Sequence, residues 1–415
     1  MNINQLELLF QWQTQTNPTA YLLACSGGRD SIALLHALYQ QKTQLSAPLE
    51  IVYINHGWHQ DAAKWGELVA TRAAAYGFSF RSVSLHLKAT KNAEAVARKA
   101  RYQAFAQLLP VNGVLLTAHH QDDQAETLLL NLCRGSGLDG LSAMPLRRSF
   151  AAGEHWRPWL LHARAEIEDY LKSQQLTFVD DSSNTDTRYQ RNWLRHQVLP
   201  LLETRFPAIR AQLAQTSAQL SAARHFQEHC LYAYLPAPEQ PFTMETLSAV
   251  PSSSRALLIR YWLRQRHLPL PPRRRLQEFI DQLDNAEHAQ IEYADRCLFR
   301  YRSEIYNVAT EPPAPPPIFA EQTHWHGIGT LTLQSGAALL SSHICRWTLY
   351  PPAARFRPHH QAHHKPLKAW FQQYGVPPFF RRRTPLLWAD DALIWVGGIG
   401  AASGWETLVI DWQRF

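Results

Sequence analysis

The sequence predicts an α/β protein with a doubly wound parallel sheet, followed by a mainly helical middle domain and a small α+β C-terminal domain. Short apolar runs lie at 21–25, 51–55, 80–85 and 114–118, and helical patterns lie at 32–40, 65–76, 93–109 and 122–134. This alternation is the βαβ rhythm of a parallel sheet. Turns rich in glycine, histidine and aspartate follow three of these strands, at 26–31, 55–57 and 119–123. Parallel sheets bind their ligands at these strand ends, so we expect the turns to share one site.

Length and composition predict how the rest of the chain is organised. At 415 residues the chain exceeds one ordinary domain. We expect a first domain over 1–205, a helical or mixed middle domain over 206–310, a proline-rich linker over 311–330 and a C-terminal domain over 331–415. Helical patterns lie at 201–235 and 255–264, strand patterns at 331–333, 347–349 and 392–396, and a further helical pattern at 367–374.

Charge and cysteine content narrow the class of protein. The formal charge of +7 and the pI of about 9.2 favour a polyanionic partner. None of the five cysteines forms a C-x-x-C pair, which argues against a zinc knuckle or a redox dithiol and indicates reduced thiols. No apolar run approaches the length of a membrane span, and the N-terminus lacks a signal-peptide pattern. We therefore expect a cytoplasmic protein without a membrane partner.

The run Ser26-Gly27-Gly28-Arg29-Asp30-Ser31 directly follows the first predicted strand. Its glycines permit a tight turn, and the first N–H groups of the next helix suit an anion. The run matches neither G-x-x-x-x-G-K-S/T nor G-x-G-x-x-G; it resembles the loop with which ATP pyrophosphatases grip the pyrophosphate of ATP. Asp30 among phosphates requires a hard cation such as Mg2+ between them. The alternative interpretation is a glycine turn in which Asp30 and Ser31 cap the helix.

The stretch 117–127, Thr-Ala-His-His-Gln-Asp-Asp-Gln-Ala-Glu-Thr, opens a helix after the fourth predicted strand. Asp123 and Glu126 are three residues apart and so share a helical face, with His119 just before the helix. Acidic residues at a helix N-terminus also complement the macrodipole. Two functional interpretations stay open: a metal site, or a pocket in which Asp123 and Glu126 pair with an amine.

The predicted helix at 93–109 carries Glu94, Arg98 and Arg101. Arg98 and Arg101 share a face and suit a phosphate or a carboxylate, whereas Glu94 and Arg98 form an ordinary surface pair in the alternative interpretation.

A fourth cluster combines turn-forming residues with arginines. Asp181 and Asn184 lie in an Asp/Ser/Asn run of the kind that forms turns. Arg191 and Arg195, one helical turn apart, suit contacts with phosphates.

Together, these motifs resemble the tRNA(Ile)-lysidine synthases, which are PP-loop enzymes of the ATP-pyrophosphatase group. The matching stretches are 26–31, 94–102, 117–127, 134–141, 157–158, 181–195, 364–371 and 375–387. One family element is missing, because Tyr350-Pro-Pro-Ala-Ala-Arg355 stands where a Gly-Gly-Glu element is usual.

The resemblance implies a reaction. These enzymes use ATP to adenylate the C2 oxygen of the wobble cytidine of an isoleucine tRNA with a CAU anticodon, releasing pyrophosphate. The ε-amine of free L-lysine then attacks C2, AMP leaves and lysidine results. The implied cofactors are ATP and Mg2+.

The resemblance also implies roles for residues. Residues 26–31 would hold the ATP phosphates, with Asp30 on Mg2+. Asp30, His119, Asp123 and Glu126 would be catalytic, and His119, Asp123, Glu126 and Arg101 would bind lysine.

Contacts with tRNA are expected from basic residues of all three domains, although each basic run is also typical of a solvated face. The candidates are Arg191, Arg195, Arg273, Arg274, Lys365, Lys368 and Arg381. The resemblance suggests a homodimer, although the sequence shows no strong self-association patch.

Two alternatives remain. A tRNA thiolation enzyme would use the same loop but carries catalytic cysteines, whereas Cys25 and Cys133 are interpreted here as buried packing residues. A tRNA-binding protein without catalysis would not need Asp30, Asp123 and Glu126.

Overall fold

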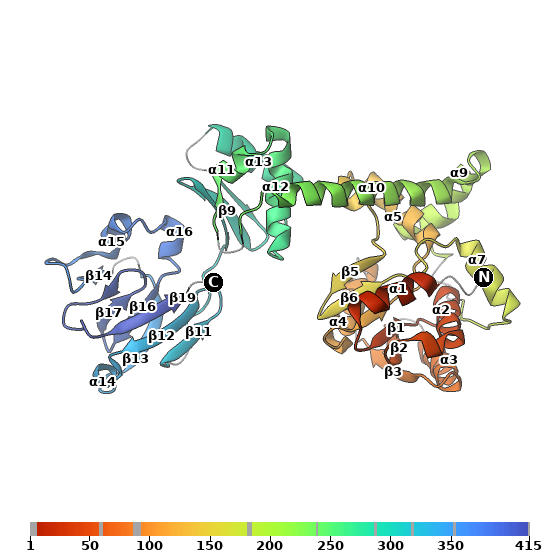
Figure 1. Ribbon diagram of the computed structural model, residues 1–415, viewed down its shortest axis with the longest axis horizontal. Coiled ribbons are helices and arrows are strands. Elements are labelled where there is room, and N and C mark those ends of the chain that lie inside the picture. Colours follow the sequence, from red (N-terminus) through yellow and green to blue (C-terminus); the bar gives the residue numbers. More distant parts are fainter. Residues whose placement is uncertain are drawn as a thin grey trace. The chain divides into compact units, whose positions relative to one another are not determined.

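The chain forms two compact units in the computed structural model, Met1–His229 and Cys230–Phe415. The structure describes residues 6–57, 61–85, 93–180, 185–237, 240–285, 289–316, 319–351 and 354–413, and the side chains of 93–95 are not among the described parts. Figure 1 shows the elements of each unit. Among the described residues, no helix is both long and apolar enough to cross a lipid bilayer.

The first unit is built on a six-stranded sheet in the order β3-β2-β1-β4-β6-β5. Its strands are β1 (Tyr21–Ala24), β2 (Leu49–Asn55), β3 (Ser79–Ser84), β4 (Val114–Leu116), β5 (Arg147–Phe150) and β6 (Gly153–Trp156). Neighbouring strands are parallel except at the edge, where β5 runs antiparallel to β6. The four predicted strands are confirmed, whereas the β5–β6 hairpin was not predicted.

Helices cover both faces of this sheet, which confirms the doubly wound arrangement. They are α1 (Glu7–Thr16), α2 (Arg29–Gln40), α3 (Ala62–Ala75), α4 (Ala93–Leu108) and α7 (Arg164–Ser173). Helices α5 (Gln121–Cys133) and α6 (Leu138–Leu141) follow β4 in the chain. Figure 1 shows α4 on one side of the strands and α2 and α3 on the other.

Successive residues of a central strand are buried on opposite faces of the sheet, which explains why helices cover both faces. Leu23 of β1 lies in the large apolar cluster that includes residues of α1, α2, α3 and α7, while its neighbour Leu22 lies in the cluster formed with Phe105 of α4. Leu22 and Leu23 are 2% and 0% exposed. A parallel strand buried on both faces reads as a continuous apolar run, because successive side chains point to opposite sides.

After the sheet, the first unit ends in helices α8 (Gln190–Trp193), the π-turn η4 (Leu194–Val198), α9 (Leu199–Arg205) and α10 (Ile209–Tyr232), the last of which runs into the second unit. The π-turn precedes Pro200, which lacks an N–H for the regular helical hydrogen bond. Arg195 lies within this turn.

The middle part of the chain is mixed rather than purely helical. Helices α11 (Met244–Ser248), α12 (Ser252–Gln265) and α13 (Arg273–Asn285) accompany an antiparallel sheet in the order β7-β10-β9-β8. The strands are β7 (Phe242–Thr243), β8 (Gln290–Tyr293), β9 (Arg296–Tyr301) and β10 (Glu304–Ala309). Trp262, Phe279 and Leu298 share their apolar core.

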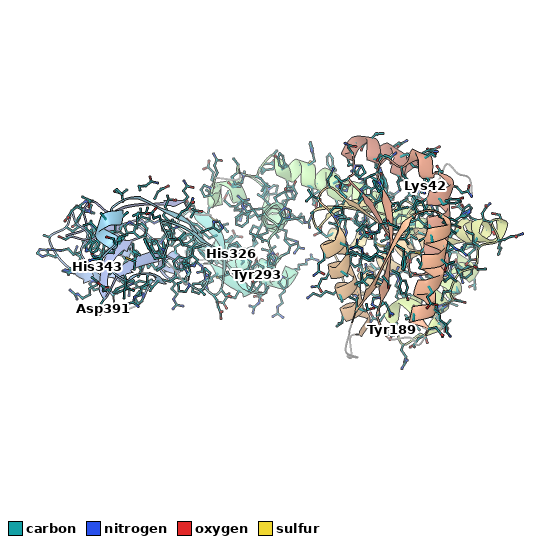
Figure 2. The ribbon with its side chains drawn as sticks, turned by 90° about the horizontal axis from the view of Figure 1, so that it is seen from below. Lys42, Tyr189, Tyr293, His326, His343 and Asp391 are labelled. Atoms are coloured by element: carbon teal, nitrogen blue, oxygen red, sulfur yellow. The ribbon has the colours of Figure 1, made fainter. Side chains whose placement is uncertain are left out.

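The C-terminal part contains a three-stranded sheet, β11-β12-β19, and a four-stranded sheet, β13-β16-β17-β18. The strands are β11 (Gln322–Trp325), β12 (Gly329–Ser335), β13 (Cys345–Leu349), β14 (Arg355–Phe356), β15 (Lys365–Pro366), β16 (Pro385–Ala389), β17 (Ala392–Val396), β18 (Gly400–Ala401) and β19 (Val409–Gln413), and the helices are α14 (Ala337–Leu340), α15 (Leu367–Gln373) and α16 (Pro378–Arg381). His343, labelled in Figure 2, bonds Asp390 through Nδ1 at 2.6 Å and joins the start of β13 to the β16–β17 turn.

Two expectations need correction. Strand β11 and the start of β12 lie inside the predicted linker 311–330, because Thr323 and Trp325 alternate inward and pair with β12. Cys25 is buried as expected, but Cys133, the last residue of α5, is exposed. Its position at a helix end places the side chain beyond the packed turns.

The packing of β1 leads to a stability prediction. We expect Leu23→Ala to lower the free energy of unfolding of the first unit by about 2–5 kcal/mol, because it opens a cavity in the central strand. Leu132→Ala is the control: Leu132 is 57% exposed, and surface substitutions cost less than about 0.5 kcal/mol. Urea denaturation of each variant measures the difference, and equal losses in the two variants would contradict this assignment of the core.

Candidate active site

The loop 26–31 turns at the carboxyl end of β1. Gly27 has φ +82°, a conformation that disfavours a side chain, and a Cβ there would meet Val69 and Val179 at 3.4 Å. The carbonyl of Gly27 accepts a hydrogen bond from the N–H of Val179 at 2.9 Å, which anchors the turn.

The capping interpretation of this loop is not what the structure shows. Gly28 is the N-cap of α2, and no side chain makes a capping hydrogen bond there. The Ser31 hydroxyl donates to the carbonyl of Gly28 at 2.9 Å, and the N–H of Gly28 donates to Ser26 Oγ at 3.3 Å. The N-terminus of α2 therefore has the polarity that favours an anion without a carboxylate cap to occupy it.

Arg29 and Asp30 point to different partners. Arg29 Nη1 pairs with Glu168 of α7 at 2.5 Å, and Glu168 also holds Arg164 at 3.0 Å. Asp30 Oδ2 lies 3.7 Å from His120 Nε2, whereas its Oδ1 is buried and has no partner. An unsatisfied buried carboxylate oxygen is costly unless a ligand completes it, so Asp30 is suited to a hard cation.

His120 lies among three carboxylates. It is 2% exposed, and its ring nitrogens lie 3.5 Å from Asp123, 3.7 Å from Asp30 and 3.9 Å from Asp122. Burial opposes a charged ring, but Asp123, Asp30 and Asp122 prevail and raise the pKa of His120 to about 9. His120 is thus an imidazolium at neutral pH.

Asp123 and Glu126 face two arginines that come from 65 or more residues away in the sequence. Glu126 is fully buried, and its oxygens accept from Arg195 Nε at 2.5 Å and Arg191 Nε at 2.7 Å. Asp123 Oδ1 accepts from Arg191 at 2.8 Å and from Arg195 at 3.2 Å. Burial opposes ionisation, but His120 and Arg191 hold the pKa of Asp123 well below its usual range.

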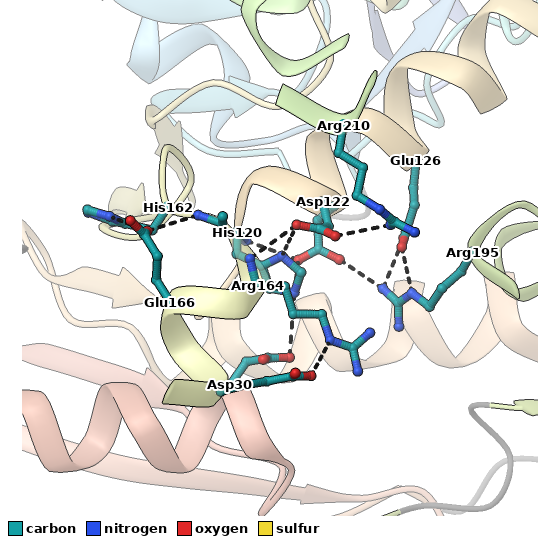
Figure 3. A network of polar contacts seen from close by, with 12 residues as sticks. Asp30, His120, Asp122, Glu126, His162, Arg164, Glu166, Arg195 and Arg210 are labelled. Carbon is teal, nitrogen blue, oxygen red and sulfur yellow. Dashed lines mark hydrogen bonds and ion pairs between the residues drawn. The ribbon is translucent and has the colours of Figure 1, made fainter. Parts of the chain in front are cut away.

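A further arginine completes the cluster. Arg210 of α10 pairs with Asp122 at 3.0 Å and with Glu203 at 2.6 Å. Figure 3 shows Asp122 directed at Arg210 and Glu126 directed at Arg195. Asp123 and Glu126, predicted to bind lysine, are thus neutralised by Arg191 and Arg195, predicted to bind tRNA phosphates, because buried carboxylates require cations.

His119 lies on the other side of this chain segment and is partly exposed. Its Nδ1 is 2.7 Å from the hydroxyl oxygen of Thr117, which is in turn 2.8 Å from Nε2 of His155 on β6. Burial and the positive charges of Arg157, Arg191 and Arg98 outweigh Asp123 and lower the pKa of His119 to about 3.

Helix α4 brings its arginines to the same neighbourhood. Arg98 and Arg101 both lie near the ring of Tyr102, at 5.2 and 5.9 Å. Arg98 influences the pKa of His119, and Arg101 that of His56, whose pKa is lowered mainly by burial. The side chain of Glu94, and the whole of Asp181 and Asn184, lie outside the described parts of the chain.

The other candidates for tRNA contact belong to the second unit. They are Arg273, Arg274, Lys365, Lys368 and Arg381. Arg274 is largely exposed and pairs with Glu278 at 3.3 Å, Lys365 lies 4.5 Å from the ring centre of Trp370, and Arg381 donates to a backbone carbonyl.

Several site residues were missed at the level of sequence. His155 and Arg148 lie on the unpredicted β5–β6 hairpin, and Arg210 lies on a helix with no motif. Thr117 and His120 are inside a recognised motif, but only the fold shows their partners. Within the described residues, no group of three or more histidine, cysteine, aspartate or glutamate side chains is arranged to hold a metal, so the structure gives no support to a metal site at 119–126.

Three family models match the chain. They are a PP-loop domain over residues 3–202, a TilS substrate binding domain over 242–306 and a TilS substrate C-terminal domain over 345–412. The tRNA(Ile)-lysidine synthase of Xylella fastidiosa (strain Temecula1) is 36% identical over 91% of this chain and 90% of its own length. That of Methylococcus capsulatus is 31% identical over 92% of this chain and 91% of its own.

Solved structures also resemble parts of the chain. The U34-tRNA thiolase NcsA from Methanococcus maripaludis is 14% identical, covers 52% of this chain and 78% of its own, and gives a TM-score of 0.42. An NH3-dependent NAD synthetase from Campylobacter jejuni is 14% identical, covers 52% and 92%, and gives a TM-score of 0.30.

The charge on His120 predicts a pH-dependent stability. Because its pKa is raised from 6.5 to about 9 on folding, the folded state binds more protons than the unfolded state between these values. The stabilisation is fully present below about pH 6.5 and is lost as the pH rises through about 9. We expect this stabilisation to reach about 3 kcal/mol in metal-free buffer.

The difference in unfolding free energy between the parent protein and His120→Gln, measured from pH 6 to 10, gives this profile. His225→Gln is the control, because the side chain of His225 is 65% exposed. A difference that stays constant, or grows as the pH rises, would show that His120 is neutral in the folded protein.

Proposed function

Because the chain belongs to the tRNA(Ile)-lysidine synthase family, we propose that it joins free L-lysine to the wobble cytidine of an isoleucine tRNA with a CAU anticodon. The C2 oxygen of cytidine attacks the α-phosphorus of ATP, and pyrophosphate leaves. The lysine ε-amine then attacks C2, and AMP leaves with the oxygen. The observation that carries the proposal is the turn 26–31 with the unpartnered Asp30 oxygen, placed beside the charged cluster of α5.

The loop 26–31 supplies the proposed ATP site. The positive φ of Gly27 and the uncapped N-terminus of α2 suit a phosphate group. Asp30 would hold Mg2+, since its buried Oδ1 has no partner in the protein. The metal ion would neutralise phosphate charge. The imidazolium of His120 keeps the other oxygen of Asp30 in place.

The proposed lysine site consists of His119, Asp123, Glu126 and Arg101. Asp123 and Glu126 carry the two carboxylates that a cationic side chain requires. Arg191 and Arg195 already pair with these two carboxylates, so we propose that the lysine amine displaces one of the two guanidinium groups. The displaced arginine can then bind a tRNA phosphate. Binding of lysine and binding of tRNA would therefore be coupled.

The remaining partners are proposed from charge. The basic residues of the second unit would contact tRNA phosphates, so we expect affinity to fall as salt rises. The bases of an anticodon loop are single-stranded, so the wobble base can be turned out of the loop and reach the active site. A cytoplasmic location follows from these substrates, and a homodimer remains part of the proposal.

Asp30 gives the direct test of the reaction. The assay supplies the purified chain with ATP, Mg2+, labelled lysine and the isoleucine tRNA transcript, with a methionine tRNA as the substrate control. We expect lysine to enter only the isoleucine tRNA, and Asp30→Asn to reduce pyrophosphate release at least about 100-fold while tRNA binding persists. Asp169→Asn, on the exposed side of α7, is the matched control.

The outcomes separate the alternatives. Pyrophosphate release without lysine incorporation would indicate another nucleophile. Binding of tRNA without any consumption of ATP would leave a non-catalytic binding protein.

Glu126 tests the proposed lysine site. We expect Glu126→Gln to raise the KM for lysine about tenfold or more and to destabilise the first unit by about 3 kcal/mol, because two partly buried guanidinium groups lose the charge of their buried partner. Glu50→Gln, which removes one partly exposed pair with Arg81, should cost less than about 1 kcal/mol. An unchanged KM for lysine in a folded Glu126→Gln variant would exclude Glu126 from lysine binding.

A further inference from the structure

A continuous chain of hydrogen bonds leads from Arg157, the residue that follows β6, to His119. Arg157 is 3% exposed, and its Nη1 donates to the carbonyl of Pro145 at 2.7 Å. Arg157 Nη2 lies 3.2 Å from Nδ1 of His155, and Arg148 Nε lies 3.4 Å from the same nitrogen. His155 is fully buried.

Arg157 and Arg148 determine which groups donate and which accept along this chain of hydrogen bonds. A guanidinium only donates, so Nδ1 of His155 must accept and carries no proton. Burial, followed by the charge of Arg157, lowers the pKa of His155, which keeps its ring neutral. Its single ring proton is therefore on Nε2 and is donated to the hydroxyl oxygen of Thr117 at 2.8 Å.

The Thr117 hydroxyl accepts a hydrogen bond from His155 and donates one to His119. Thr117 is 8% exposed and its oxygen already accepts from His155, so its one proton is directed to Nδ1 of His119 at 2.7 Å. This is the only arrangement in which both ring nitrogens of His155 and the Thr117 hydroxyl proton have partners, and an unmade hydrogen bond at a buried group is costly. Nδ1 of His119 is then an acceptor, which leaves its proton on Nε2.

We propose that His155 and Thr117 are positioning residues that hold His119 as a neutral ring protonated at Nε2, so that His119 donates a hydrogen bond to a substrate oxygen and does not serve as the base for the lysine amine. The role toward substrate rests on the proposed function; the protonation pattern does not. The acceptor is an anionic oxygen, supplied either by the lysine carboxylate or by the α-phosphoryl group of ATP. The partial exposure of His119 leaves it accessible to such a group.

A donor fixed in this way suits the charges around it. Burial is the main cause of the lowered pKa of His119, and the positive charges of Arg157, Arg191 and Arg98 lower it further against Asp123. These arginines also attract an anionic oxygen. A neutral N–H can bind that oxygen without first gaining a proton, and it is already aligned before the substrate arrives.

The first test reads the proton directly. The full chain is labelled with 15N-histidine, and long-range 1H–15N correlations are recorded at neutral pH without ATP, lysine or tRNA. The resonances are assigned by their loss in His119→Gln and His155→Gln. We expect both rings to be protonated at Nε2 alone. A proton on Nδ1 of His119, or on both of its nitrogens, would overturn the proposal.

The second test breaks this chain of hydrogen bonds. Thr117→Val keeps the shape of the side chain but removes the hydroxyl, so we expect the two protonation forms of His119 to mix, whereas Thr117→Ser should keep the parent spectrum. Thr16→Val is the matched control, since the Thr16 hydroxyl donates to the backbone carbonyl of Trp12 in α1 at 3.0 Å. If Thr117→Val is poorly folded, the parent and Thr117→Ser spectra decide.

Kinetics identify the acceptor. In Thr117→Val, a rise of about tenfold in the KM for lysine with unchanged pyrophosphate release would indicate the lysine carboxylate. A similar fall in pyrophosphate release with an unchanged KM for lysine would indicate the phosphoryl oxygen. Either result supports the donor role, and no change in either quantity overturns it. If the parent protein itself shows no activity, the proposed function is refuted. The protonation pattern of His119 would still be tested by the NMR spectra.

Discussion

The first unit depends on the burial of carboxylates at the start of α5. Asp122, Asp123 and Glu126 lie within two helical turns and are 8%, 8% and 0% exposed. Capping requires no more than one of them, and an unpaired buried carboxylate costs several kcal/mol, so the fold must bring cations to this place. His120 provides one from the same segment, while the others come from distant helices.

This requirement explains how the later helices attach to the sheet domain. Arg191 and Arg195 belong to α8 and the π-turn η4, and Arg210 belongs to α10; each reaches α5 through a charged hydrogen bond or ion pair. The π-turn widens the helix at Arg195, within the segment where both arginines must face Glu126. The cluster therefore attaches the later helices to α5, and in the proposed function a ligand that takes one of its charges would also loosen this attachment.

Much of this architecture could be predicted from the sequence, and the missing parts share a physical reason. Continuous apolar runs such as 21–24 reveal buried parallel strands, and the glycines of the loop 26–31 reveal the turn. The edge hairpin β5–β6 was not predicted because its strands are short and mostly polar in sequence, with β5 partly exposed, and because Ala151 takes the left-handed turn conformation usually given to glycine or asparagine. The spacing of Arg191 and Arg195 predicts a shared face, but nothing local says that this face meets Glu126, 65 residues away.

The adjacent residues His119 and His120 show why residue type alone does not define a role. The backbone of His120 is extended, so neighbouring side chains point to opposite sides. The ring of His120 lies among carboxylates that raise its pKa to about 9 against the effect of burial. The pKa of His119 is lowered to about 3, first by burial and then by the charges of Arg157, Arg191 and Arg98. The same motif therefore supplies a ring that is cationic at neutral pH beside the proposed ATP loop and a neutral ring beside the proposed lysine site. A base for the lysine amine must be sought among groups other than these two, because one has no free lone pair at neutral pH and the other directs its proton outward.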